Sequence, residues 1–149
     1  INLNEVVSNV VNLNKMSAGN KGINIKADVP DDIFVYADRN MLETVLRNLL
    51  SNAIKFSYEN SEINISVENA DSKYIVSVVD NGVGIPKERI DTIFSMDAKS
   101  TIGTQGETGN GLGLAVCDRM VRKNGGEIFV ESEPNKFTKF YFTINKANV

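Results

Sequence analysis

The feature that most restricts how this chain can fold is an apolar stripe on a long predicted helix. From Asp38 to about Phe56, apolar residues recur three and four positions apart, which is the spacing of one helix face. Asp38 is of a residue type that caps helix N-termini well. A stripe that covers more than four turns has to be buried, so this helix must pack on another layer of the domain. The stripe consists of Leu42, Val45, Leu46, Leu49, Leu50 and Ala53.

Alternating apolar and polar residues predict strands on both sides of this helix. A half-buried strand shows this two-residue period, and turn residues such as Asn, Asp, Gly and Pro separate the alternating segments. Three pairs of segments therefore predict three pairs of short strands joined by turns. The pairs are 23–27 with 33–37, 63–67 with 74–78, and 128–130 with 140–144.

Helical patterns fill the remaining chain, apart from a glycine-rich loop predicted over 95–110. Hairpins that alternate with helices predict an α+β fold, a two-layer α/β sandwich in which one mixed, mostly antiparallel sheet carries its helices on one face. No internal repeat or linker divides the chain, so residues 1–149 are expected to form one domain. The further predicted helices are one that starts at Leu3 and breaks at 18–22, a short one from Pro86 to about Phe94, and one over 112–121 that ends at Asn124-Gly125-Gly126.

The composition excludes several kinds of chemistry. The 149 residues contain no histidine and one cysteine, Cys117, which excludes Ser–His and Cys–His nucleophiles, an internal disulfide and an ordinary zinc site. The formal charge of −3, with basic residues spread along the chain, gives no nucleic-acid-binding surface. Chemistry must therefore rest on carboxylates, amides, lysines and backbone groups. Because the chain begins at Ile1 in a helical pattern, we expect it to be an excised fragment.

The first candidate cluster lies late in the long helix. Asn48, Asn52 and Lys55 are spaced at i, i+4 and i+7, which puts two amides and an ammonium on one helix face. An amide oxygen suits Mg²⁺, which binds few protein ligands and takes the rest from phosphates and water. Such a face could hold a metal and phosphates, and the alternative is an ordinary solvated face.

The second candidate cluster, Asp80-Asn81-Gly82-Val83-Gly84-Ile85-Pro86, directly follows a predicted strand. Asp80 ends an otherwise apolar strand, so its carboxylate is expected at the edge of the core. There it could accept a hydrogen bond from an exocyclic amine such as that of adenine. Gly82 and Gly84 allow a sharp turn and the close approach of a ligand. The alternative is an Asx-type turn between strand and helix.

The third candidate cluster is the glycine-rich run 103–114, which opens a predicted helix. Backbone amides at a helix N-terminus favour an anion, so the run predicts phosphate binding, with a flexible linker as the alternative. The glycines match neither a P-loop nor the Rossmann fingerprint nor a protein Ser/Thr kinase loop. Any nucleotide site is therefore of another kind.

In this order and spacing, the clusters resemble the boxes of the family that unites histidine kinases, gyrase-type ATPases, heat-shock chaperones and MutL-type repair proteins. Residues 48–55 resemble the N box, 80–84 the first glycine box and 109–113 the second, while Phe94 resembles part of the F box. The resemblance extends over nearly the whole chain, including 124–132. It implies a Bergerat-type ATP-binding fold with ATP and Mg²⁺ as cofactors.

The resemblance also implies a role for each residue. Asn52 would be the Mg²⁺ ligand, and Asn48 would support the metal and the phosphates. Lys55 would reach the phosphates, Phe56 would lie near the adenine, and Asp80 would bind the adenine amine. The other implied nucleotide-binding residues are Gly82, Gly84, Ile85, Lys99, Ser100, Thr101, Gly109, Gly111, Leu112 and Gly113, with 95–110 as the ATP lid.

Within this family, Asn48 indicates the subclass. Members that hydrolyse ATP resemble one another in having a glutamate four residues before the Mg²⁺ asparagine as the general base for water. Here that position is Asn48, and a neutral amide cannot deprotonate water. The chain therefore resembles the histidine kinase form, in which catalysis rests on positioning and charge neutralisation. Asn48 and Lys55 would position ATP, and no other catalytic residue is expected in this fragment.

The resemblance implies partners that lie outside the chain. The γ-phosphoryl group would pass to a histidine on a separate helical dimerisation domain of the same protein, and then to the receiver domain of a response regulator. The parent would be a homodimer that acts in the cytoplasm, and the fragment would be a monomer that binds ATP without phosphorylating itself. Two alternatives remain open at this point. They are a serine kinase that resembles the bacterial anti-sigma factors, and a degenerate nucleotide-binding scaffold.

Overall fold

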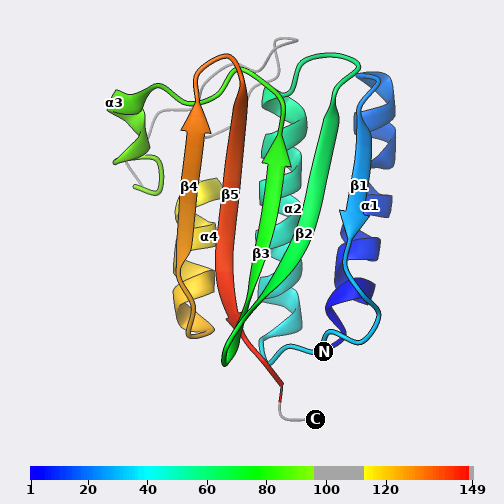
Figure 1. Cartoon of the computed structure of the whole chain (residues 1–149), viewed down its shortest axis with the longest axis vertical. Helices are drawn as coiled ribbons and strands as arrows, with labels where there is room; N and C mark the ends of the chain where they lie inside the picture. Colours follow the sequence, from blue (N-terminus) through cyan, green and yellow to red (C-terminus); the bar gives the residue numbers. More distant parts are fainter. Residues whose placement is uncertain (96–112, 148–149) are drawn as a thin grey trace.

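Five strands form one mixed sheet in the computed structural model, which describes residues 1–95 and 113–147 (Figure 1). The strand order is β1-β2-β3-β5-β4, with β1 parallel to β2 and the other neighbours antiparallel. The hairpins predicted for the middle and the end of the chain are confirmed as β2–β3 and β4–β5. The strands are β1 (Asn24–Asp28), β2 (Glu62–Ala70), β3 (Lys73–Asp80), β4 (Ile128–Glu133) and β5 (Phe137–Asn145).

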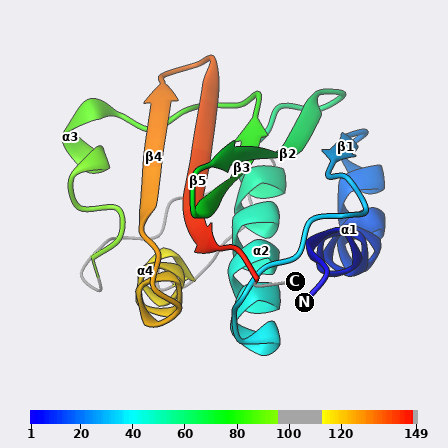
Figure 2. The same cartoon turned by 60° about the horizontal axis from the view of Figure 1, so that its bottom comes forward.

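Three helices cover one face of this sheet, as Figure 2 shows, and the core lies between the two layers. They are α1 (Leu3–Asn20), α2 (Arg39–Phe56) and α4 (Gly113–Lys123), while the short α3 (Lys87–Ile90) lies beside β4. The predicted two-layer α+β fold is therefore confirmed. Within the described ranges, no helix combines the length and the apolar character needed to cross a bilayer. All six residues of the α2 stripe are buried, and they face inward-pointing strand residues that include Ile63, Ile65, Val76, Val78, Phe140 and Phe142.

The strand predicted over 33–37 is wrong. Phe34 and Val35 form only isolated bridges, with Asn2 and Lys146, and β1 pairs with β2 instead. The alternation misleads because Val35 is buried where the first residues of the chain meet the end of β5. The helix predicted over 86–94 is also too long, since α3 covers one turn and Pro86 lies at its N-cap position.

Side-chain and backbone caps fix the ends of α2 and α4. The Asp38 carboxylate accepts a 2.9 Å hydrogen bond from the Met41 amide, which confirms the predicted N-cap of α2. At the end of α4, the Gly126 amide donates to the Val121 carbonyl and the Gly125 amide to the Arg122 carbonyl, the pattern of a Schellman motif. This confirms the predicted C-cap of α4.

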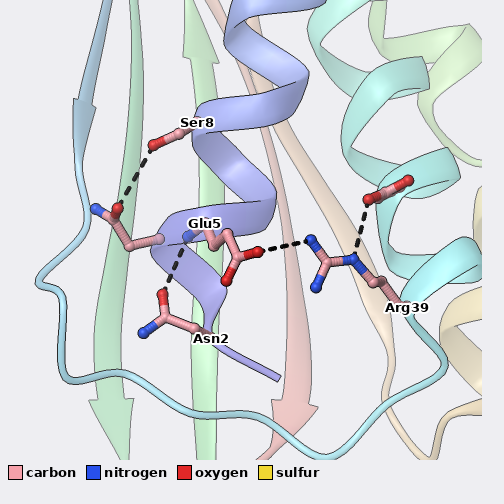
Figure 3. Close-up of polar contacts among 6 residues, drawn as sticks. Asn2, Glu5, Ser8 and Arg39 are labelled. Atoms are coloured by element: carbon pink, nitrogen blue, oxygen red, sulfur yellow. Dashed lines mark hydrogen bonds and ion pairs between the residues drawn. The ribbon is translucent and has the colours of Figure 1, made fainter.

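Polar contacts join α1 to α2 near their N-terminal ends (Figure 3). The Arg39 guanidinium lies 3.2 Å from the Glu5 carboxylate on α1 and 3.3 Å from the Glu43 carboxylate on its own helix. The Asn2 side chain accepts a hydrogen bond from the Glu5 amide and caps α1. The ion pairs are solvent-accessible and each contributes about 0–1 kcal/mol. They align the two helices, whereas the buried stripe supplies the stability.

Candidate functional site

Several segments that sequence analysis singled out end at one edge of the sheet, which lies at the top of Figure 1. The C-terminal ends of α1 and α2, the end of β3 and the turn between β4 and β5 all lie there. Backbone hydrogen bonds join these segments, including those from the Asn60 amide to the Lys21 carbonyl and from the Val83 amide to the Phe56 carbonyl. The edge is therefore one connected site, built from parts that are far apart in the sequence.

The turn after β3 lies between α2 and the β4–β5 turn. The Val83 amide donates to the Phe56 carbonyl at 3.1 Å, and the Asn135 amide donates to the Val83 carbonyl at 2.7 Å. A Cβ atom at Gly82 would lie 1.9 Å from the Phe56 carbonyl oxygen, so only glycine fits there. Gly84 has φ +71° and also no room for a side chain, since a Cβ would lie 2.4 Å from the Glu133 carbonyl oxygen.

These contacts give both glycines a structural role that needs no ligand. Ile85 also has a structural contact, since its amide donates a 2.7 Å hydrogen bond to the Ser132 hydroxyl. The direct contribution of Gly82, Gly84 and Ile85 to nucleotide binding stays a prediction.

Asp80 ends β3 on the helix-covered face, on the same side as the buried Val76 and Val78. Its side chain is 3% exposed, and within the described residues its Oδ1 has no hydrogen-bond partner. Burial raises the pKa of Asp80 to about 7, against lowering effects from a hydrogen bond with the Thr138 backbone and from the positive charge of Lys21. A buried carboxylate oxygen without a partner is unfavourable for the free protein and is a strong acceptor for a ligand N–H group.

The predicted polar face of α2 is present. Asn48, Asn52 and Lys55 are all half-buried, and the Lys55 ammonium lies 5.0 Å from the centre of the Phe56 ring. Among the residues described, no three histidine, cysteine, aspartate or glutamate side chains gather into a metal site. Any Mg²⁺ here would have to take most of its ligands from phosphates and water, which fits the amide-rich face.

Asn48 also contacts the first turns of α4. A Cβ atom at Gly113 would lie 3.8 Å from the Asn48 side-chain amide. Further along α4, the Cys117 thiol donates to the Val45 carbonyl of α2 at 3.8 Å. The Cys117 side chain is fully buried, and burial raises its pKa to about 12. This is the environment of a small core residue rather than a reactive thiol.

Lys21 is a buried charged residue of this edge that sequence analysis missed. Its side chain is 4% exposed, and the ammonium donates 2.9 Å hydrogen bonds to the carbonyl oxygens of Ile54 and Lys55. In the sequence it lies in the polar break after the first helix, and its partners are more than thirty positions away. No local pattern could have singled it out.

Part of the predicted site lies outside the described residues. This holds for the lid predicted over 95–110, apart from Ser95, and for most of the second glycine box. Gly113 is described and begins α4. Phe94, the F-box candidate, packs edge-on against Phe140 with ring centres 6.1 Å apart. The predicted site residues outside the described part are Lys99, Ser100, Thr101, Gly109, Gly111 and Leu112.

The raised pKa of Asp80 leads to a stability prediction. The folded protein binds the Asp80 proton more tightly than the unfolded chain, so this carboxyl group stabilises least above pH 7, where it is ionised in both states. Asp80→Asn removes that ionisation. Between pH 4 and pH 8 the free energy of unfolding of the variant, relative to wild type, should therefore rise by up to about 4 kcal/mol.

Denaturant titrations of both proteins over this pH range provide the measurement. The control is Asp71→Asn, because Asp71 is exposed at the distant β2–β3 turn and has φ +58°, which asparagine tolerates. For this control the difference from wild type should stay constant with pH. A constant difference for Asp80→Asn as well would contradict the assigned burial of the carboxylate.

Comparison with known proteins agrees with this geometry. The chain matches the family described as histidine kinase-, DNA gyrase B- and HSP90-like ATPase over residues 37–148. It is 38% identical over 126 residues to the adaptive-response sensory kinase SasA of Prochlorococcus marinus strain MIT 9313, covering 83% of this chain and 34% of that protein. The chain thus spans about a third of the length of the curated relatives it matches.

Solved structures show the same relationship. The catalytic domain of histidine kinase ThkA is 36% identical, with a TM-score of 0.83 and coverage of 98% of this chain and 93% of that one. ThkA in complex with the response regulator protein TrrA is 31% identical, with a TM-score of 0.79 and coverage of 99% and 41%. These matches confirm the resemblance inferred from the three boxes. The chain therefore belongs to the histidine kinase-, DNA gyrase B- and HSP90-like ATPase family and, within it, to the ATP-binding catalytic domains of histidine kinases.

Proposed function

We propose that this chain binds Mg²⁺-ATP and presents the γ-phosphoryl group to a histidine on a separate helical dimerisation domain of the same protein. The observation that carries the proposal is the buried Oδ1 of Asp80 at the connected edge of the sheet, which has no hydrogen-bond partner among residues 1–95 and 113–147. A family that binds ATP supplies a ligand with a matching N–H donor, the exocyclic amine of adenine. In this proposal residues 1–149 act as one domain.

Asp80 would select the base through one hydrogen bond. Its carboxylate accepts and cannot donate when ionised, so it favours an amine over a carbonyl at the facing position of the base. Binding of the amine would give the buried oxygen a partner, which none of the described residues provides. This is how a desolvated acceptor discriminates strongly between ligands that carry the donor and ligands that do not.

The phosphates and the metal would lie along the polar face of α2. We assign the Mg²⁺ ligand to Asn52, a supporting role to Asn48 and a phosphate contact to Lys55. When bound, Mg²⁺ supplies charge neutralisation at the phosphate oxygens. The face offers amide oxygens without a carboxylate cluster, which suits a metal that arrives with the nucleotide.

The presence of an asparagine at position 48 favours the interpretation that the phosphoryl group passes to a protein acceptor and not to water. The Asn48 side chain is a neutral amide that lies beside the start of α4. It therefore has no base to offer to an attacking water. The relatives described above are histidine kinases, which favours a histidine over the serine acceptor of the anti-sigma-factor-like alternative.

We infer the partners from the same relationship. ThkA has been crystallised with a response regulator, and we propose that the parent of this chain likewise passes its phosphoryl group to a receiver domain. The parent would be a homodimer joined through the histidine-bearing domain, and the catalytic chain would act in the cytoplasm as a monomeric unit.

Asp80→Asn should weaken ADP binding at pH 8 by about 10- to 100-fold. A hydrogen bond to a charged acceptor contributes roughly 1.5–3 kcal/mol, and the asparagine amide would also present a donor to the adenine amine. Calorimetric titration with ADP and with a non-hydrolysable ATP analogue measures the effect. Asp71→Asn serves as the control and should bind like wild type. Unchanged affinity in Asp80→Asn would refute the assignment of Asp80 to the base.

Asn52→Ala should lose the gain in ATP-analogue affinity that Mg²⁺ gives the wild-type protein, because the metal would lose its protein ligand. Titrations with and without Mg²⁺ measure this gain. Asn40→Ala is the matched control, since Asn40 is an exposed asparagine in the first turn of the same helix. If Asn52→Ala keeps the full Mg²⁺ effect, Asn52 is not the ligand.

A further inference from the structure

A buried lysine is uncommon, because removing an ammonium group from water is costly unless its donors find partners. Lys21 follows α1 directly and is 4% exposed. Its ammonium donates to the Ile54 and Lys55 carbonyls, which belong to the last turn of α2 and have no acceptor role within that helix. A cation at the negative end of a helix is also favourable. Lys21 therefore acts as a charged cap on α2.

The end of α2 that Lys21 caps is the surface on which the turn after β3 rests. Immediately beyond the capped carbonyls, the Phe56 carbonyl accepts from the Val83 amide, and Ser57 forms a bridge with Gly82. The Tyr58 amide then donates to the Asn81 carbonyl at 3.2 Å. The position of the Lys21 ammonium thus sets where the backbone next to Asp80 lies.

Lys21 also acts on Asp80 through its charge. Its positive charge opposes the effect of burial on the Asp80 carboxyl group. The neighbouring elements offer no comparable charge within the described residues. Thr138, which pairs with Asp80 on β5, is neutral, Lys55 lies over the Phe56 ring, and the start of α4 over 113–117 is uncharged.

We propose that Lys21 is a positioning residue of the nucleotide site, whose ammonium holds the end of α2 against the turn after β3 and places a positive charge near the Asp80 carboxylate that accepts from the base. The proposal rests on the binding function proposed above. It adds to the site a residue that lies far from Asp80 in the sequence, at the end of α1. Lys21 touches carbonyl groups of the protein, so it acts on the ligand through Asp80 and the turn.

The test is the pH dependence of ADP affinity in Lys21→Met, measured by calorimetry without Mg²⁺ from pH 6 to pH 9. At each pH the affinity is divided by that of wild type, so the titration of the nucleotide's own phosphates cancels. Loss of the charge lets the Asp80 pKa rise, and each rise of one unit lowers the ionised fraction about tenfold at a pH below it. Wild-type Asp80 is about half ionised at pH 7, so a rise of one pKa unit should lower affinity there about fivefold, with the gap narrowing by pH 9.

Three companion variants separate charge from structure. Lys21→Arg keeps the charge and should follow the wild-type pH profile. Lys21→Gln keeps a donor for the α2 carbonyls without the charge, and it should reproduce the Lys21→Met profile even if the methionine variant folds poorly. Leu3→Ala weakens the core at the opposite end of α1, where Leu3 is fully buried, and its ADP affinity should match wild type at every pH.

Each outcome bears on a separate claim. If Asp80→Asn weakens binding as predicted while Lys21→Met and Lys21→Gln lose affinity equally at all pH values, or lose none, the role of Lys21 on Asp80 is refuted and the proposed function stands. If wild type fails to bind ADP, or Asp80→Asn binds it normally, the proposed function itself fails.

Discussion

A carboxylate at the inner end of a core strand is the constraint around which this domain is arranged. Asp80 occupies the position where the apolar face of β3 would otherwise continue, and burial raises its pKa to about 7. Holding such a group costs folding free energy, which the deep apolar contacts between α2 and the sheet must offset. A ligand that donates a hydrogen bond to this carboxylate would offset the cost. A buried acceptor without a partner then increases both the affinity for that ligand and the selectivity against ligands that lack the donor.

The surroundings of Asp80 are made mostly of backbone. The turn after β3 is held by the Phe56 carbonyl on one side and by the β4–β5 turn on the other, with no room for a side chain at Gly82. The end of α2 is in turn fixed by the Lys21 ammonium. Gly82 of the first glycine box is therefore required for close backbone packing, whether or not a ligand also approaches it. A site built this way depends on the exact placement of three chain segments rather than on a cluster of reactive side chains.

Much of this could be predicted from the sequence, because the strongest patterns reflect burial. The α2 stripe, the β2–β3 and β4–β5 hairpins, the Asp38 N-cap and the Gly125 C-cap are local signals, and the structure confirms them. The strand prediction for 33–37 was wrong because the alternation there arises from contacts with residues near both ends of the chain and not from pairing within the sheet. The burial of Lys21 and the approach of Asn48 to the start of α4 could not be predicted, since each depends on which helices meet in three dimensions. The order of the three boxes predicted the family better than any single box, because each box taken alone has an ordinary structural explanation.

The central claim is that Asp80 is a buried, poorly partnered carboxyl group that ADP completes. Its pKa can be followed directly by carbon-detected NMR of the side-chain carboxyl group in the 149-residue chain, with the resonance assigned by its loss in Asp80→Asn. We expect a pKa near 7 in the free protein and a lower value with saturating ADP, because a donor from the base stabilises the charged form. A resonance that titrates near 4 in the free protein, or one that ADP does not shift, would contradict the account.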